Sequence, residues 1–230
     1  MWTIAEIKES GKRAFKANYW PCVLVAFLMA LFEGGGSVAS SSSQTQQTEL
    51  SEAMSGMQTN EQIAVVLAIL GAVLLVVGIS IVVRIFLANP IALGGCNFFK
   101  TNHTDTPASL DLLKTGFQNY GHTFVVLFVR DLYLVLWTLL LIVPGIIKAY
   151  SYCMVPYILA EHPELSANEV ITRSREMMQG NKGRAFLLDL SFFGWILLSI
   201  LTLGLLQLFW TGPYMESTHA ALYLKLKEQG

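Results

Sequence analysis

The chain has 230 residues, of which 53% are hydrophobic and only 13% are charged. Soluble domains carry about 25% charged residues, so the composition indicates an integral membrane protein. The formal net charge is −1, and no basic stripe with interleaved aromatics is present, so nucleic acid is excluded as an expected partner. Three widely spaced cysteines stand among apolar residues, which argues against a disulfide framework or a zinc site: Cys22, Cys96 and Cys153.

The N-terminal segment combines an amphipathic stretch with a short apolar run. Residues 4–16 place their apolar side chains on one side, which predicts an interfacial helix within residues 1–17. The basic residues of this helix are Lys8, Lys12, Arg13 and Lys16. The apolar run from Trp20 to Phe32 then predicts a first, short membrane span, begun by the interfacial aromatic pair Tyr19 and Trp20.

A secretory signal peptide is the alternative interpretation of the same segment. The order of basic, apolar and small residues fits such a peptide, with Ser37-Val38-Ala39 resembling a cleavage site. Glu6 and Glu9 within the basic region count against it.

Residues 34–61 are rich in Ser, Gln, Thr and Gly and predict an external polar loop, with a short helix near residues 47–57. The clearest span follows, from Ile63 to Val83, which holds no charged residue and would extend roughly 30 Å as a helix. Ala64, Gly71 and Gly78 recur at seven-residue intervals, so we expect another helix to pack closely against this face.

Four further spans are expected in the second half of the chain. Residues 124–143 and 186–206 are long apolar runs. Pro144-Gly145 predicts a tight turn that folds residues 146–160 back against the preceding span as a hairpin. The last span, residues 213–226, is weaker because it contains Glu216 and His219.

Two loops carry short helices of their own. In residues 100–120, Asp105-Thr106 before Pro107 predicts a short interfacial helix that ends near Phe117. In residues 161–184, Ser166 and Glu169 match a capping box, with Gly180 as the stop of the helix.

The positions of Lys and Arg set the orientation. Residues 34–61 contain neither, whereas the N-terminal segment, the two helical loops and the C-terminal tail all do. Six spans place these groups on one side of the membrane, and only Lys148 falls near the other. The sequence therefore predicts an all-α transmembrane bundle of about six spans, residues 1–230 forming one domain. Both termini are expected in the cytoplasm, and the protein in the cell membrane.

Several charged residues are expected at membrane depth, where they are costly and must be paired or functional. Counting from the helix ends places four of them in the inner third: Arg84, Arg130, Asp131 and Asp189. Lys148 and Glu216 are expected at similar depth near the outer side, as an ion pair, and His219 shares the face of Glu216. Two interpretations stay open: mutual neutralisation that holds helices together, or a polar vestibule for a headgroup, an ion or a proton relay.

No nucleophile–base grouping, phosphate loop or metal-ligand spacing stands in the sequence. We therefore expect neither an enzyme nor a bound cofactor. The lipid bilayer is the expected partner, beside a membrane-protein partner or a second copy of the chain.

The C-terminal half contains an ordered set of motifs. Leu140–Tyr152 reads LLIVPGIIKAYSY, and Val155–Glu161, residues 188–195 and Gly212-Pro213-Tyr214 follow. This order resembles an uncharacterised bacterial family of six-span membrane proteins with a domain of unknown function. That family is distantly similar to the membrane domain of some glycerophosphodiester phosphodiesterases, whose soluble catalytic domain has no counterpart here.

Two functions fit these features best, and an intramembrane enzyme using Glu216 and His219 is the weakest alternative because the sequence shows no partner nucleophile. The first is a non-enzymatic role in the envelope or as an accessory subunit. The second is a small transporter or lipid-handling protein, for which a cavity lined by the intramembrane charges would be evidence.

Overall fold

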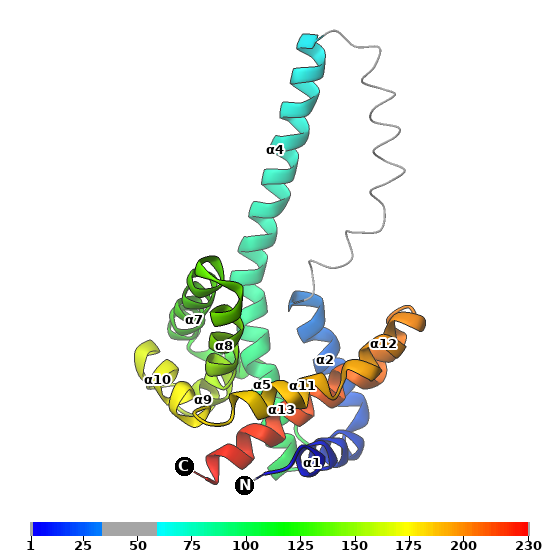
Figure 1. Ribbon diagram of the computed structural model, residues 1–230, viewed down its shortest axis with the longest axis vertical. Coiled ribbons are helices and arrows are strands. Elements are labelled where there is room, and N and C mark those ends of the chain that lie inside the picture. Colours follow the sequence, from blue (N-terminus) through cyan, green and yellow to red (C-terminus); the bar gives the residue numbers. More distant parts are fainter. Residues whose placement is uncertain (1, 34–58, 230) are drawn as a thin grey trace.

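The structure is a computed structural model that describes residues 2–33 and 59–229, and within these ranges the chain is helical without a strand (Figure 1). The helices are α1 (Ile4–Ala17), α2 (Tyr19–Glu33), α4 (Thr59–Val83), α5 (Asn89–Thr104), α6 (Thr115–Gln118), α7 (Tyr120–Leu140), α8 (Ile142–Tyr152), α9 (Val155–Glu161), α10 (Ala167–Met177), α11 (Lys182–Leu190), α12 (Phe193–Leu201) and α13 (Gly212–Lys227). Two π-helical turns, Arg84–Ala88 and Gln207–Thr211, and one 3₁₀ turn, Leu110–Lys114, join them.

The core lies at the end of the molecule where both chain ends are found (Figure 1). There α13 packs against α1, α2 and α5, and α9 packs against α5. Phe15, Phe98, Phe99 and Tyr223 are fully buried in this region. The predicted amphipathic helix α1 is confirmed, but its apolar face packs on α13 instead of lying only on lipid.

Three helices are long and apolar enough to span a membrane: Tyr120–Leu140, Ile142–Glu161 and Lys182–Leu201. A fourth is obtained if α1 and α2, bent by 106°, count as one broken span. Length and composition therefore give three or four spans among the described residues, not clearly the expected six. The last segment does not qualify because α13 has only 16 residues, and these include Glu216, Lys225 and Lys227.

The α7–α8 hairpin turns at a different residue from the one predicted. Leu141 is extended, with φ −161°, and α8 begins at Ile142. Pro144 lies in the first turn of α8. Backbone N–H groups in that turn have no acceptor within the helix, so the N–H that proline lacks costs no hydrogen bond. Gly145 instead permits close packing, since a Cβ there would lie 2.7 Å from Thr138 Oγ1. The hairpin was predicted correctly and its turn was not.

Two of the expected spans are interrupted. Cys153 and Met154 separate α8 from α9, and Ser191 and Phe192 separate α11 from α12. Phe192 is fully buried at the second interruption. Tyr150 lies just before the first break and Asp189 just before the second, and both side chains belong to the cavity described below.

Helix α4 projects away from the other helices (Figure 1). Its apolar side chains between Ile63 and Val76 are mostly exposed. A Cβ placed at Gly71 or Gly78 would meet no described atom within 4 Å. The expected helix against this small-residue face is therefore absent from the described part of the chain.

The two helical loops follow the sequence in part. The capping box is confirmed, because Ser166 accepts a hydrogen bond from the Glu169 backbone N–H and Glu169 accepts one from Ser166 N. Gly180 ends this region with φ +78°. The segment expected to be one helix from Pro107 to Phe117 is instead a 3₁₀ turn, capped by Ser109, followed by α6. The short helix near residues 47–57 and the Ser37-Val38-Ala39 site lie outside the described residues.

Replacing Ser166 with Ala is expected to destabilise α10 by about 1 kcal/mol, because the cap of its N-terminal turn is lost. The hydrogen bonds from Ser166 also hold the pKa of Glu169 below its ordinary value of 4.5. Since a depressed native pKa favours the folded state only above the ordinary value, this contribution is lost as the pH falls. Amide hydrogen exchange at Val170 and Ile171 should accelerate in the variant, and unchanged exchange would contradict the assignment.

Candidate functional site

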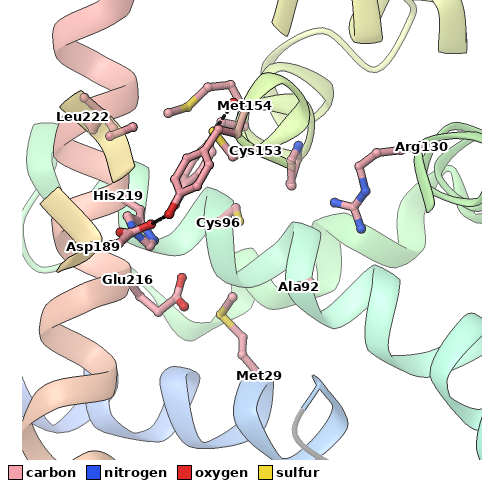
Figure 2. A pocket seen from close by; sticks show the side chains of 14 residues that line it. Met29, Ala92, Cys96, Arg130, Cys153, Met154, Asp189, Glu216, His219 and Leu222 are labelled. Atoms are coloured by element: carbon pink, nitrogen blue, oxygen red, sulfur yellow. Dashed lines mark hydrogen bonds and ion pairs between the residues drawn. The ribbon is translucent and has the colours of Figure 1, made fainter. Parts of the chain in front are cut away.

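A cavity of about 160 Å³ lies between the interrupted helices and α13 (Figure 2). Its walls come from α2, α5, α7, α8, α9, α11 and α13 and from the break between α8 and α9. Apolar and sulfur-containing side chains form part of the lining, among them Met29, Cys96, Cys153 and Leu222. The polar groups that face it are Arg130, Tyr150, Asp189, Glu216 and His219.

Asp189 is the centre of a hydrogen-bonded cluster in this cavity. Its Oδ1 lies 2.7 Å from Nε2 of His219, and its Oδ2 accepts a hydrogen bond of 2.8 Å from the hydroxyl of Tyr150. The side chains of Asp189 and His219 are 30% and 32% exposed, so both retain surface towards the cavity. The cluster joins α8, α11 and α13.

Local structure explains how Asp189 is positioned. It lies in the last turn of α11, directly before the break. Ser191 stabilises this break, because its hydroxyl donates to Leu188 O at 2.6 Å and its own O and Oγ accept from Lys8 Nζ at 3.2 and 3.0 Å. The ammonium group of Lys8 also lies 4.2 Å from the ring centroid of Phe192. Helix α1 therefore fixes the end of α11 from the other side.

Glu216 faces the same cavity but, unlike Asp189, its carboxylate has no partner among the described residues. It precedes His219 by three residues, so both side chains lie on one face of α13, as predicted. Figure 2 shows its carboxylate directed into the space beside Met29 and below Asp189. No described residue forms a hydrogen bond or an ion pair with this carboxylate, unlike Asp189.

Arg130 lines the opposite wall of the cavity from the acidic groups (Figure 2). Its guanidinium binds Asp131, with Nη2 and Nε at 2.7 and 2.9 Å from Oδ1. Asn89 donates a further hydrogen bond of 3.4 Å to Oδ2 of Asp131. The predicted neighbours Arg130 and Asp131 are thus paired with each other and not with Asp189.

The expected ion pair between Lys148 and Glu216 is not formed. The ammonium group of Lys148 lies 4.6 Å from the ring centroid of Trp137, on the neighbouring helix of the α7–α8 hairpin. Equal depth did not bring the two side chains together, because depth leaves the rotation of each helix about its axis undetermined. The backbone of Arg84 lies in the first π-helical turn, and its side chain lies outside the described part.

Tyr150 was not expected to belong to the site. A tyrosine inside an apolar helix usually places its hydroxyl on a partner, and the two tyrosines of the Tyr150-Ser151-Tyr152 sequence were the available signal. A second polar cluster was also missed. Glu161 accepts hydrogen bonds from Tyr223 at 2.9 Å and Lys227 at 2.7 Å, and its other oxygen lies 3.3 Å from Lys100 Nζ. This cluster is fully paired, so it serves to join α5, α9 and α13.

The cavity contains an Asp–His pair, but the described residues add neither a set of metal ligands nor a hydroxyl nucleophile bonded to the histidine. Within the described residues, no group of three His, Cys, Asp or Glu side chains is arranged to hold a metal ion. The hydrogen bonds of His219 in that part of the chain include none to a serine or threonine hydroxyl. What the arrangement provides is a carboxylate beside a carboxylate–imidazole pair, which can hold a cation or a proton.

Comparison with known proteins identifies the family of this chain but no relative of known function. Residues 3–230 match the model of a family described as a protein of unknown function (DUF975). No curated protein and no solved structure matches the chain. The expected distant likeness to phosphodiesterase membrane domains therefore has no support, and no residue role can be transferred from a relative. The match covers nearly the whole chain, so this protein belongs to the DUF975 family of unknown function.

Proposed function

We propose that this protein is a non-enzymatic membrane protein that binds a small cationic solute in the cavity between α8, α11 and α13. The observation that carries the proposal is the carboxylate of Glu216, which faces the cavity without a hydrogen-bond or ion-pair partner among the described residues. Carboxylates at membrane depth are costly unless they are paired, so an unpaired one beside a cavity favours a mobile cation as its partner.

The neighbouring charges support a cationic occupant. Asp189 already has His219, and the guanidinium of Arg130 is held by Asp131. Neither Arg130 nor Lys148 compensates Glu216. The volume of about 160 Å³ lies below the roughly 300–1,000 Å³ of pockets for larger organic ligands, so a monovalent ion or an ammonium group fits better.

We further propose six membrane segments with both ends in the cytoplasm of a bacterial cell. In this topology the six segments are α2, α4, α7, α8–α9, α11–α12 and α13. Both chain ends lie at the same end of the molecule in Figure 1. The distribution of Lys and Arg favours the cytoplasm for that end.

Replacing Glu216 with Gln tests the binding proposal, because the amide keeps the shape and removes the charge. The purified protein should unfold at a higher temperature in sodium, potassium or ammonium chloride than in the chloride of bulky N-methylglucamine. At about ten times Kd a bound ion stabilises by roughly 1.4 kcal/mol, a shift on the order of 3 °C. The variant should lose this cation-specific shift.

Glu176→Gln is the matched control, because Glu176 is an exposed glutamate of α10 outside the cavity. It should keep the shift of the original protein. If no small cation stabilises the original protein beyond N-methylglucamine, or if Glu216→Gln retains the full effect, the cavity groups act only in holding the helices together. The first function considered, a purely structural role in the envelope, would then be favoured.

A further inference from the structure

A second cavity on the outer side of α2 differs completely in character from the one already described. This groove, of about 500 Å³, is lined by apolar side chains throughout: Trp20, Pro21, Val23, Leu24, Phe27, Leu110, Leu208 and Phe209. It runs along the first half of α2, with one wall from the second π-helical turn. Trp20 is 70% exposed at its edge.

One end of the groove lies at the corner where α1 meets α2. There the hydroxyl of Tyr19 donates a hydrogen bond of 2.9 Å to Phe209 O, which joins the corner to the groove wall. The ammonium group of Lys16, in the last turn of α1, lies 5.9 Å from the ring centroid of Trp210, the residue after Phe209. Lys16 does not line the groove itself, but it lies on the residue that follows the groove-wall residue Phe209.

Two of the four cations of α1 have polar or carboxylate partners in other side chains, and two have no carboxylate partner among the described residues. Lys8 is bound to Ser191, and Arg13 pairs with Glu9 at 3.6 Å. Lys12 and Lys16 have no carboxylate partner in the part of the chain that the structure describes. They are four residues apart, so they share a face of α1 and repel each other unless an anion lies between them.

We propose that the groove binds one anionic phospholipid, with an acyl chain along α2 and the phosphate at Lys12 and Lys16. The charge at the corner selects an anionic headgroup, and the uniformly apolar wall fits a hydrocarbon chain. Indole rings favour the level of the headgroups, which is where Trp20 and Trp210 would lie. The groove shares no lining residue with the Glu216 cavity, although α2 contributes to both.

Native mass spectrometry of the purified full chain, titrated with phosphatidylglycerol or phosphatidylcholine, tests the proposal. The original protein should retain phosphatidylglycerol in preference. Lys12→Gln/Lys16→Gln should lower that preference on the order of tenfold, since each cation near a headgroup contributes. Arg173→Gln/Arg175→Gln, which removes two exposed cations from α10, should leave the preference unchanged.

Leu24→Trp gives a second test from the apolar side. Leu24 is 45% exposed on the groove wall, so the larger ring should fill the groove and displace lipid without disturbing the core.

Equal retention of both lipids by the original protein would overturn the proposal. So would displacement of the lipid by inorganic phosphate alone, or dimers in place of bound lipid, which would assign the groove to a second copy.

Discussion

Gly11→Ala is expected to disrupt the packing of α1 on α13 and to lower the free energy of unfolding by about 1–3 kcal/mol. A Cβ at this position would lie 2.6 Å from Thr218 Oγ1 and 2.7 Å from Thr218 Cα. The hydroxyl can rotate away but the backbone atom cannot, so the two helices must separate. The same crossing holds the hydrogen bond of 2.9 Å from the Ser217 hydroxyl to Gly11 O, which would lengthen.

Thermal unfolding in detergent measures this loss, and Gly71→Ala provides the matched control within a helix. No described atom lies within 4 Å of a Cβ at Gly71, so alanine should be neutral or stabilise by up to about 1 kcal/mol. Equal stability of Gly11→Ala and the original protein would show that α1 does not cross α13 this closely. A marked loss in Gly71→Ala would reveal a neighbour of α4.

Asn102→Leu is expected to cost about 3 kcal/mol or more, because it leaves several buried groups without partners. Asn102 is fully buried. Its amide nitrogen donates to Ala14 O at 2.8 Å, and its Oδ1 accepts from Asn18 Nδ2 at 2.9 Å and from Ala108 N at 3.3 Å. One side chain thus joins the end of α1, the start of α2 and the segment after α5.

The same unfolding assay applies, with Gln118→Leu as the control because Gln118 is exposed at the end of α6. The control should change stability by less than about 0.5 kcal/mol. Because Asn102 fixes the corner between α1 and α2, its loss should also weaken phosphatidylglycerol retention. A stable Asn102→Leu protein would contradict the hydrogen-bonded corner.

The sequence predicted features that depend on local chemistry or on composition. The Ser166–Glu169 capping box and the amphipathic face of α1 were confirmed, since each is decided by residues within one or two turns. The shortage of charged residues indicated membrane helices, and three helices of the described residues are long and apolar enough to span a membrane. The face shared by Glu216 and His219 followed from helix periodicity alone.

Partners between helices were decided only by the tertiary structure. Counting residues along a span gives the depth of a charge, but not the direction in which its side chain points. Lys148 therefore lies on Trp137 and not beside Glu216, and Asp189 binds His219 and Tyr150 and not Arg130. The rotation and tilt of each helix, set by contacts such as Gly11 on Thr218, determine which charges are paired and leave Glu216 facing the cavity.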